Sequence, residues 1–149
     1  VLVALTGGYW VGGRLADRHP HAGALARAAL LGAGLVALIP LAAIPLLGVT
    51  EDSLAEMPGS LVALLVLVGP PVLVLGALSP WAIRLRVRAV AAAGHITGRL
   101  YALSTAGGLV GNFLAALALI PLVGTRWTFL ICAALLAVAS APIAWRRAA

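Results

Sequence analysis

The sequence predicts an all-α fold, a polytopic bundle of about five transmembrane helices. Hydrophobic residues make up 63% of the 149 residues and charged residues only 9%, whereas a soluble domain carries about 25% charged residues. Because so few charges cannot cover a globular surface, the chain needs an apolar solvent. Its apolar runs also lack the two-residue alternation of membrane barrel strands, so they are predicted to be helical.

Four apolar stretches approach the roughly 20 residues that a helix needs to cross a hydrocarbon core. In a single transmembrane domain covering residues 1–149, the expected spans are Ala22–Gly48, Ser60–Ala82, Leu100–Leu122 and Thr128–Trp145. The last span is the shortest, and Trp127 and Trp145 flank it as interfacial tryptophans do. Residues 1–13 are apolar but reach only about 20 Å as a helix. We expect them to form a partial span in a chain that is truncated, processed or mis-started.

Prolines interrupt the expected spans, as is common where neighbouring helices can satisfy the carbonyls that a proline frees. These prolines are Pro40, Pro45, Pro70, Pro71, Pro121 and Pro142. They are either an ordinary feature of membrane helices or the sites of kinks that support motion. Pro80 is expected to end or bend the third apolar run. Residues 83–93 are then predicted to lie along the membrane interface, until Gly94 and Gly98 break that helix.

The charges are distributed unequally between the two sides of the membrane. All ten basic residues are arginines. Three lie at the first junction between spans, four at the third and two in the C-terminal tail, whereas Arg126 lies at the fourth. The second junction carries the acids Glu51, Asp52 and Glu56. By the positive-inside rule, the odd junctions and the C-terminus are predicted to be cytoplasmic. The exclusive use of arginine indicates a bacterial, GC-rich source, and therefore the cytoplasmic (inner) membrane.

Few residues are suited to chemistry. The arginines are not interleaved with exposed aromatic residues, so nucleic-acid binding is not expected. Cys132 stands alone and the three histidines are scattered, which argues against a disulfide framework or a metal site. The chain has no carboxylate pair, no Ser/His/Asp set and no glycine-rich nucleotide loop between a strand and a helix. We therefore expect no catalytic, metal-binding or cofactor-binding residue, and no enzyme.

The first motif combines a glycine face with a charged end. Gly8 and Gly12 are four residues apart, so one face of their helix lacks side chains and another helix can approach it closely. Asp17 lies between Arg14 and Arg18. Its carboxylate can pair with these arginines or cap the N-terminus of a neighbouring helix. An ordinary basic loop with a satisfied carboxylate is the alternative.

Residues 13–18, Gly-Arg-Leu-Ala-Asp-Arg, resemble the loop between the second and third helices of the major facilitator superfamily. In that family, Asp and Arg residues latch the cytoplasmic side in one conformational state. The resemblance implies a fold like half of a facilitator, and it assigns the latch to Gly13, Arg14, Asp17 and Arg18. His19 and Pro20 stand where the family has Gly-Arg-Arg.

A basic segment at the third junction is the second motif. It is either a cytoplasmic element that faces lipid or a partner protein, or an ordinary basic loop, and its arginines are Arg84, Arg86, Arg88 and Arg99. The third motif lies within an expected span. There Gly107 and Gly111 form another small-residue face, and the spacing recurs between Ser104 and Gly108. Asn112 is expected to hydrogen-bond between packed helices, with substrate contact as the alternative.

Four separated segments, in order, resemble the membrane domain of fused facilitator/spermidine-synthase-like proteins. The segments are Gly8–Arg18, Gly76–Pro80, Gly98–Thr105 and Leu119–Arg126. The resemblance implies a helical membrane bundle that such proteins join to a cytosolic domain of aminopropyltransferase fold. We expect this chain to hold the membrane part without the catalytic domain, so no aminopropyl-transfer residue is assigned.

Two functions are compatible with these observations. The first is a non-catalytic membrane module that contacts lipids and anchors or assembles with a partner protein, a larger membrane complex or further copies of itself through its glycine-rich faces. The second is half of a facilitator-type transporter of small solutes, polyamine-like ones included, which acts as an oligomer because one half cannot enclose a transport cavity.

Overall fold

The computed structural model describes residues 1–53, 56–87 and 90–145. This part of the chain is helical almost throughout, which confirms the all-α prediction. The elements are α1 (Leu2–Arg18), α2 (Ala22–Ser53), α3 (Glu56–Arg86), α4 (Val90–Leu114), the π-helical segment η1 (Ala115–Leu119) and α5 (Ile120–Trp145).

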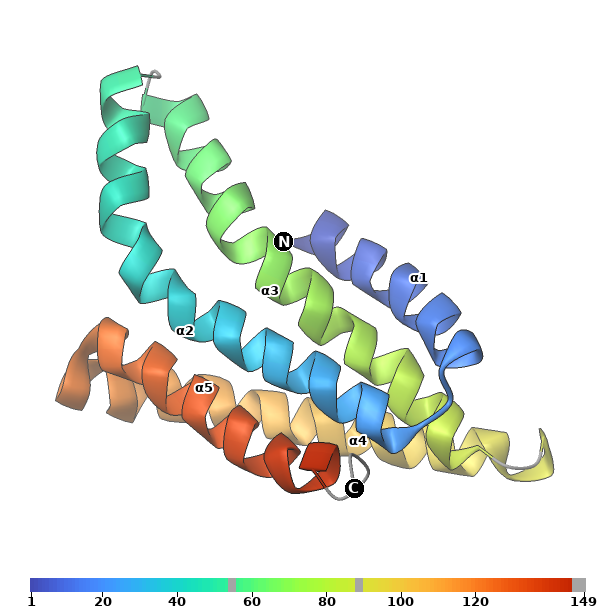
Figure 1. The fold of residues 1–149 in the computed structure, drawn as a ribbon. Helices are drawn as coiled ribbons and strands as arrows, with labels where there is room; N and C mark the ends of the chain where they lie inside the picture. Colours follow the sequence, from blue (N-terminus) through green and yellow to red (C-terminus); the bar gives the residue numbers. More distant parts are fainter. Residues whose placement is uncertain (54–55, 88–89, 146–149) are drawn as a thin grey trace.

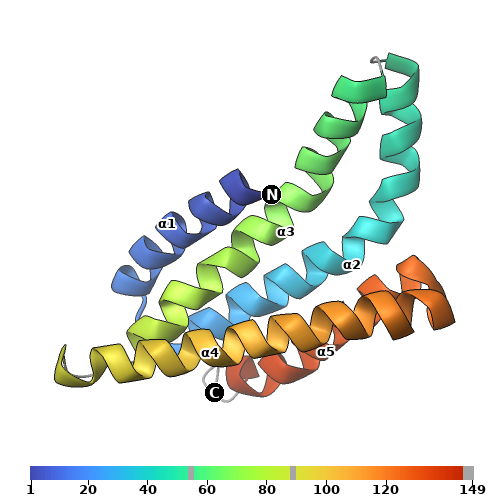
Figure 2. The same ribbon diagram turned by 180° about the vertical axis from the view of Figure 1, so that it is seen from behind.

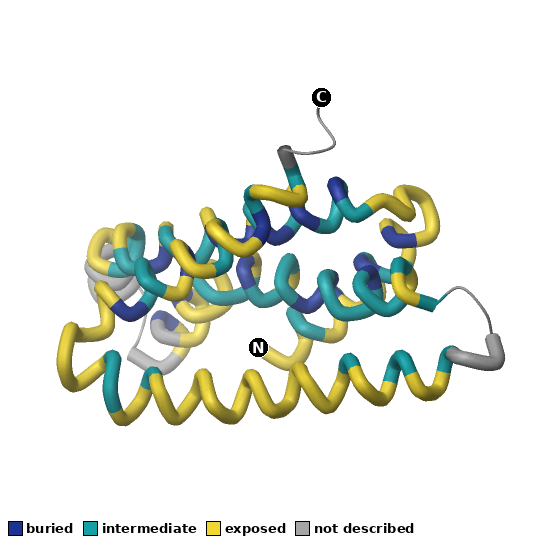
Figure 3. Tube along the Cα trace, turned by 90° about the horizontal axis from the view of Figure 1, so that it is seen from below, coloured by how far each residue is buried: buried dark blue, intermediate teal, exposed yellow. Residues whose placement is uncertain are grey.

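The helices form a layer to which α4 is loosely attached (Figures 1 and 2). Helix α1 packs on α3, α3 packs on α2, and α2 packs on α5. Helix α4 approaches α3, but within the described residues its backbone does not approach α1, α2 or α5. In Figure 3, α4 runs along one side of the molecule as a mostly exposed helix.

Three helical runs are long and apolar enough to cross a membrane, as judged by length and composition: Ala22–Leu46, Leu61–Arg86 and Ala93–Ala144. They indicate a membrane protein. Helix α1, with 17 residues, is not among them. The third run contains the expected span Leu100–Leu122 and all but the last residue of Thr128–Trp145. It is divided at Gly124, where φ is 82° and ψ is 163°. Glycine adopts positive φ without steric cost, so the chain can turn back here (Figure 2).

Several helices continue beyond the boundaries expected from the sequence. Pro80 lies inside α3, which ends only at Arg86, and Gly94 and Gly98 lie inside α4. The third run therefore does not end at Pro80, which leaves a bend as the other form of that expectation, and the expectation that these glycines break the next helix is wrong. Proline removes one backbone donor and glycine weakens helix propensity, but neither effect outweighs the backbone hydrogen bonds of a long apolar helix. Helix α2 also continues to Ser53, into the acidic segment expected to be a loop.

Small residues form the contacts between the helices. Of the nine buried hydrophobic residues in the described part of the chain, Ile39 and Trp81 are large and the others are alanines: Ala16, Ala26, Ala29, Ala33, Ala63, Ala77 and Ala133. Many leucines and valines are exposed instead. This distribution is typical of membrane helices, because lipid solvates large apolar side chains while small residues let backbones approach.

Candidate functional site

The closest helix contact lies where α1 crosses α3. A Cβ atom added to Gly8 would overlap the carbonyl oxygen of Leu73, and one added to Gly12 would lie 2.5 Å from the Cα atom of Ala77. A Cβ atom on Gly76 would lie 3.2 Å from the carbonyl oxygen of Leu5. Both helices therefore contribute glycine to the crossing, and the first glycine face of the sequence packs within the chain.

Polar contacts join the same two helices near the end of α1. Arg84 Nε donates to Asp17 Oδ1 at 3.2 Å. Trp81 Nε1 donates to the carbonyl oxygen of His19 at 3.2 Å, and the Trp81 residue is only 4% exposed. We call these four residues the α1–α3 clasp. The clasp brings together the facilitator-like motif and the start of the basic segment.

The carboxylate of Asp17 thus pairs with a distant arginine rather than with the arginines beside it in the sequence. The guanidinium of Arg14 lies over the ring of Trp10, with its Cζ atom 3.4 Å from the ring centroid. This cation–π contact gives Arg14 a neutral partner one helical turn away. Arg18 lies in the last turn of α1, where its charge suits the helix dipole. Gly13 has no neighbour within 4 Å of an added Cβ atom.

The arginines of the basic segment do not form a single cluster with Asp17. Arg84 belongs to the clasp, whereas Arg86 lines a cavity between α2, α3, α4 and α5. Arg99 is exposed on α4, and Arg88 lies outside the described residues. The structure therefore assigns these arginines to different surroundings.

Helix α4 carries the second glycine face and leaves it uncovered. Every residue from 101 to 114 is exposed. Gly107, Gly108 and Gly111 have no neighbour within 4 Å of an added Cβ atom. Among the described residues, the side chain of Asn112 has no hydrogen-bond partner. The expected helix packing of Gly107, Gly111 and Asn112 is thus not supplied by the part of the chain that the structure describes.

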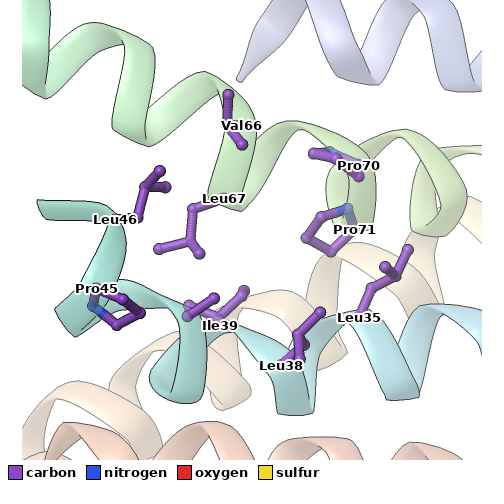
Figure 4. A pocket seen from close by; sticks show the side chains of 10 residues that line it. Leu35, Leu38, Ile39, Pro45, Leu46, Val66, Leu67, Pro70 and Pro71 are labelled. Carbon is purple, nitrogen blue, oxygen red and sulfur yellow. The ribbon is translucent and has the colours of Figure 1, made fainter. Parts of the chain in front are cut away.

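A groove lies between α2 and α3, and proline residues of both helices line it (Figure 4). Its volume is about 510 Å³, and its lining includes Pro45, Pro70 and Pro71 together with leucines and valine. Because its side chains are all apolar, the groove has no group that could bind an ion or carry a proton.

Sequence reasoning did not identify the α3 side of the crossing or the role of Trp81. Gly76 and Ala77 are adjacent small residues within a run of leucine and valine, and this local drop in size was the available signal. Trp81 follows Pro80 near arginines, a position that reads as interfacial rather than buried.

The described residues contain no group of three or more His, Cys, Asp or Glu side chains that could hold a metal ion. The chemistry of the clasp is therefore limited to an ion pair, a hydrogen bond and close helix packing. These interactions can hold helices α1 and α3 together or, when they break, release them.

No protein-family model, curated protein or solved structure matches this chain.

Proposed function

We propose that this chain is a non-catalytic integral membrane module that assembles with a partner protein, or with another copy of itself, through one face of α4. The observation that carries the proposal is the exposed Asn112 side chain within the candidate span Ala93–Ala144. It would be a subunit of a larger membrane complex, in a bacterial cytoplasmic membrane with its C-terminus inside.

The polar group of Asn112 needs a partner. Moving an amide from water to an apolar medium without a hydrogen bond costs roughly 2–7 kcal/mol. Polar residues in membrane helices therefore nearly always face protein or a water-filled cavity. Because the described residues give Asn112 no partner, a hydrogen-bonding group from another polypeptide is the simplest source of one.

The surroundings of Asn112 suit a second helix. Ser104, Gly108 and Asn112 follow one another at four-residue intervals, and Gly107 and Gly111 lie next to this row on the helix surface. Small residues at this spacing let two helix backbones come close, so that dispersion and weak hydrogen bonds add up. A leucine on this face would keep a partner helix away.

We expect Gly111→Leu and Asn112→Leu each to weaken assembly about threefold to tenfold, the range expected for losing one interhelical contact in a membrane. The matched control is Ala106→Leu, because residue 106 lies on the opposite side of α4. Crosslinking in native membranes, followed by measurement of complex size in mild detergent, reports the effect. A complex of full size and yield in both test variants would contradict the proposal.

A second function is favoured by the asymmetry of the two ends of α3. The clasp joins α3 to α1 at one end, whereas the proline-lined groove separates α3 from α2 towards the other end. Closure at one end and opening at the other is what alternating access requires. The chain would then be half of a facilitator-type transporter of small solutes, polyamine-like ones included, acting as an oligomer.

Transport predicts that Asp17→Asn abolishes solute uptake into liposomes. The ion pair is exposed, and such pairs contribute about 0–1 kcal/mol to stability, so the variant should remain folded. Uptake should return in the charge-swapped double variant Asp17→Arg with Arg84→Asp. Polyamine and amine uptake are measured with wild-type protein in parallel; uptake that is absent in wild-type liposomes, or unchanged by Asp17→Asn, would contradict transport.

Membership in the fused facilitator/spermidine-synthase-like proteins is likewise a proposal. It is supported by the order of the four sequence segments and by the contact between two of them. Gly8 of the first segment and Gly76 of the second lie at the same helix crossing. The co-purification of an aminopropyltransferase-like domain with this chain from native membrane would support it further.

A further inference from the structure

A cavity of about 660 Å³ separates α4 from the packed helices. It is lined by small and branched apolar side chains from four helices, including Ala26 of α2, Ala82 of α3, Leu100 of α4 and Ile143 of α5. A smaller hollow of about 210 Å³ shares Leu78, Ala82 and Leu100 with it, so the two adjoin. Together they form a largely apolar space between α4 and the packed helices.

One end of this space is cationic. The exposed Arg86 side chain lines the cavity. In contrast to Arg84, Arg86 has no ion-pair partner within the described residues. The acid of this end, Asp17, is already paired with Arg84.

Hydroxyl groups also line this space. Ser140 lines the cavity, but its hydroxyl already donates to the carbonyl oxygen of Leu136 at 2.7 Å. Ser79, Tyr101 and Ser104 line the adjoining hollow, and their hydroxyls have no hydrogen-bond partner in the described part of the chain. They can donate to ester oxygens, while the guanidinium of Arg86 can donate two hydrogen bonds to a phosphate.

We infer that this cavity binds one anionic phospholipid, with an acyl chain between α4 and the α2–α5 pair and the phosphate at Arg86. An apolar space that ends in an unpaired cation is complementary to an anionic amphiphile, because the acyl chain fits the apolar part and the anionic headgroup fits the cation. Neither an acyl chain nor a headgroup alone would match both parts. The basic end is also where an anionic leaflet would supply such a lipid. This site adjoins the exposed α4 face through which assembly is proposed, and the two share Ser104.

The test uses the full chain in nanodiscs of phosphatidylglycerol and phosphatidylcholine with identical acyl chains. After transfer to mild detergent, native mass spectrometry counts the lipid that stays bound. We expect about fivefold preference for phosphatidylglycerol, the effect of one arginine near a phosphate, and near-equal retention in Arg86→Gln. The matched control Arg126→Gln removes the same charge at a different junction and should keep the preference.

Two further variants test the apolar half of the site. Ala82→Leu and Ala139→Leu fill the cavity from different helices, so one remains informative if the other fails to fold. Each should reduce retention of both lipids while thermal stability stays near that of the wild type. Glycerol phosphate, which is the headgroup without its chains, should not compete at millimolar concentration.

Four results would overturn the inference. Competition by glycerol phosphate would indicate an anion site without an acyl chain. Equal retention of the two lipids by the wild type would indicate an apolar surface without headgroup recognition. An unchanged preference for phosphatidylglycerol in Arg86→Gln would mean that Arg86 does not bind the phosphate. No retained lipid in the wild type would mean that the cavity does not hold a phospholipid.

Discussion

Gly12→Ala is expected to lower the free energy of unfolding by about 1–3 kcal/mol, the cost of overpacking a close contact. The added methyl group would lie 2.5 Å from both the Cα atom and the carbonyl oxygen of Ala77. Since these are backbone atoms of α3, no side-chain rotation can relieve the clash, and α1 must move away. Gly8→Ala should have a similar effect, because it meets the backbone of Leu73.

The neighbouring glycines provide matched controls. Gly13→Ala adds a methyl group where nothing lies within 4 Å, and Gly7→Ala adds one at 3.8 Å from the Leu73 side chain, an ordinary contact. Both controls should leave stability unchanged or raise it slightly through helix propensity. Thermal unfolding in detergent compares the two test variants with the two controls. Proteolysis of the α1–α2 connection provides a local measure of the same effect. Equal stability of Gly12→Ala and Gly13→Ala would mean that α1 does not rest on α3.

Trp81→Ala should destabilise the protein by about 3–5 kcal/mol, the usual cost of removing a large buried side chain. Trp81 is 4% exposed, so its removal leaves a void. The substitution also removes the hydrogen bond from the indole to the carbonyl oxygen of His19, which ties the α1–α2 connection to α3. We expect faster proteolysis between residues 18 and 22 as well as a lower melting temperature.

Trp81→Phe separates the hydrogen bond from the packing. The carbonyl oxygen of His19 keeps the backbone N–H of His21 as a donor at 2.7 Å, so the loss should be nearer the about 0.5–1.5 kcal/mol of an ordinary hydrogen bond. The expected order of stability is therefore wild type, Trp81→Phe, Trp81→Ala. If the phenylalanine variant were as unstable as the alanine variant, the stability of the clasp would depend on the hydrogen bond from the Trp81 indole and not on the volume of the Trp81 side chain.

The presence and type of the long helices could be predicted from the sequence, because length and hydrophobicity alone determine them. The runs beginning near Ala22 and Leu61 are examples, since both recur as candidate spans. The residues at which the helices begin and end were predicted less accurately than the presence of the helices. Pro80, Gly94 and Gly98 carry local signals for a helix end, but the tertiary and membrane environment outweighs propensities of a few kcal/mol.

The residues that α1 contributes to the candidate site could be predicted from the sequence, but their contact partners on α3 could not. Gly8, Gly12 and Asp17 stand out by spacing and charge, but their partners lie on α3. Arg84 is 67 residues from Asp17, and no periodicity in one sequence connects such distant positions. Local chemistry therefore identifies surfaces that need a partner, whereas the identity of the partner depends on how the helices fold against each other.

The backbone conformation of Gly124 has a geometric consequence for the rest of the molecule. The helical arm from Val90 to Val123 is about 50 Å long at 1.5 Å per residue. A rotation of about 10° at Gly124 would therefore swing the far end of that arm by roughly 9 Å. Helix α4 also contacts α3, so the width of the gap between α4 and the α2–α5 pair depends both on that contact and on the two dihedral angles of Gly124, at φ 82° and ψ 163°.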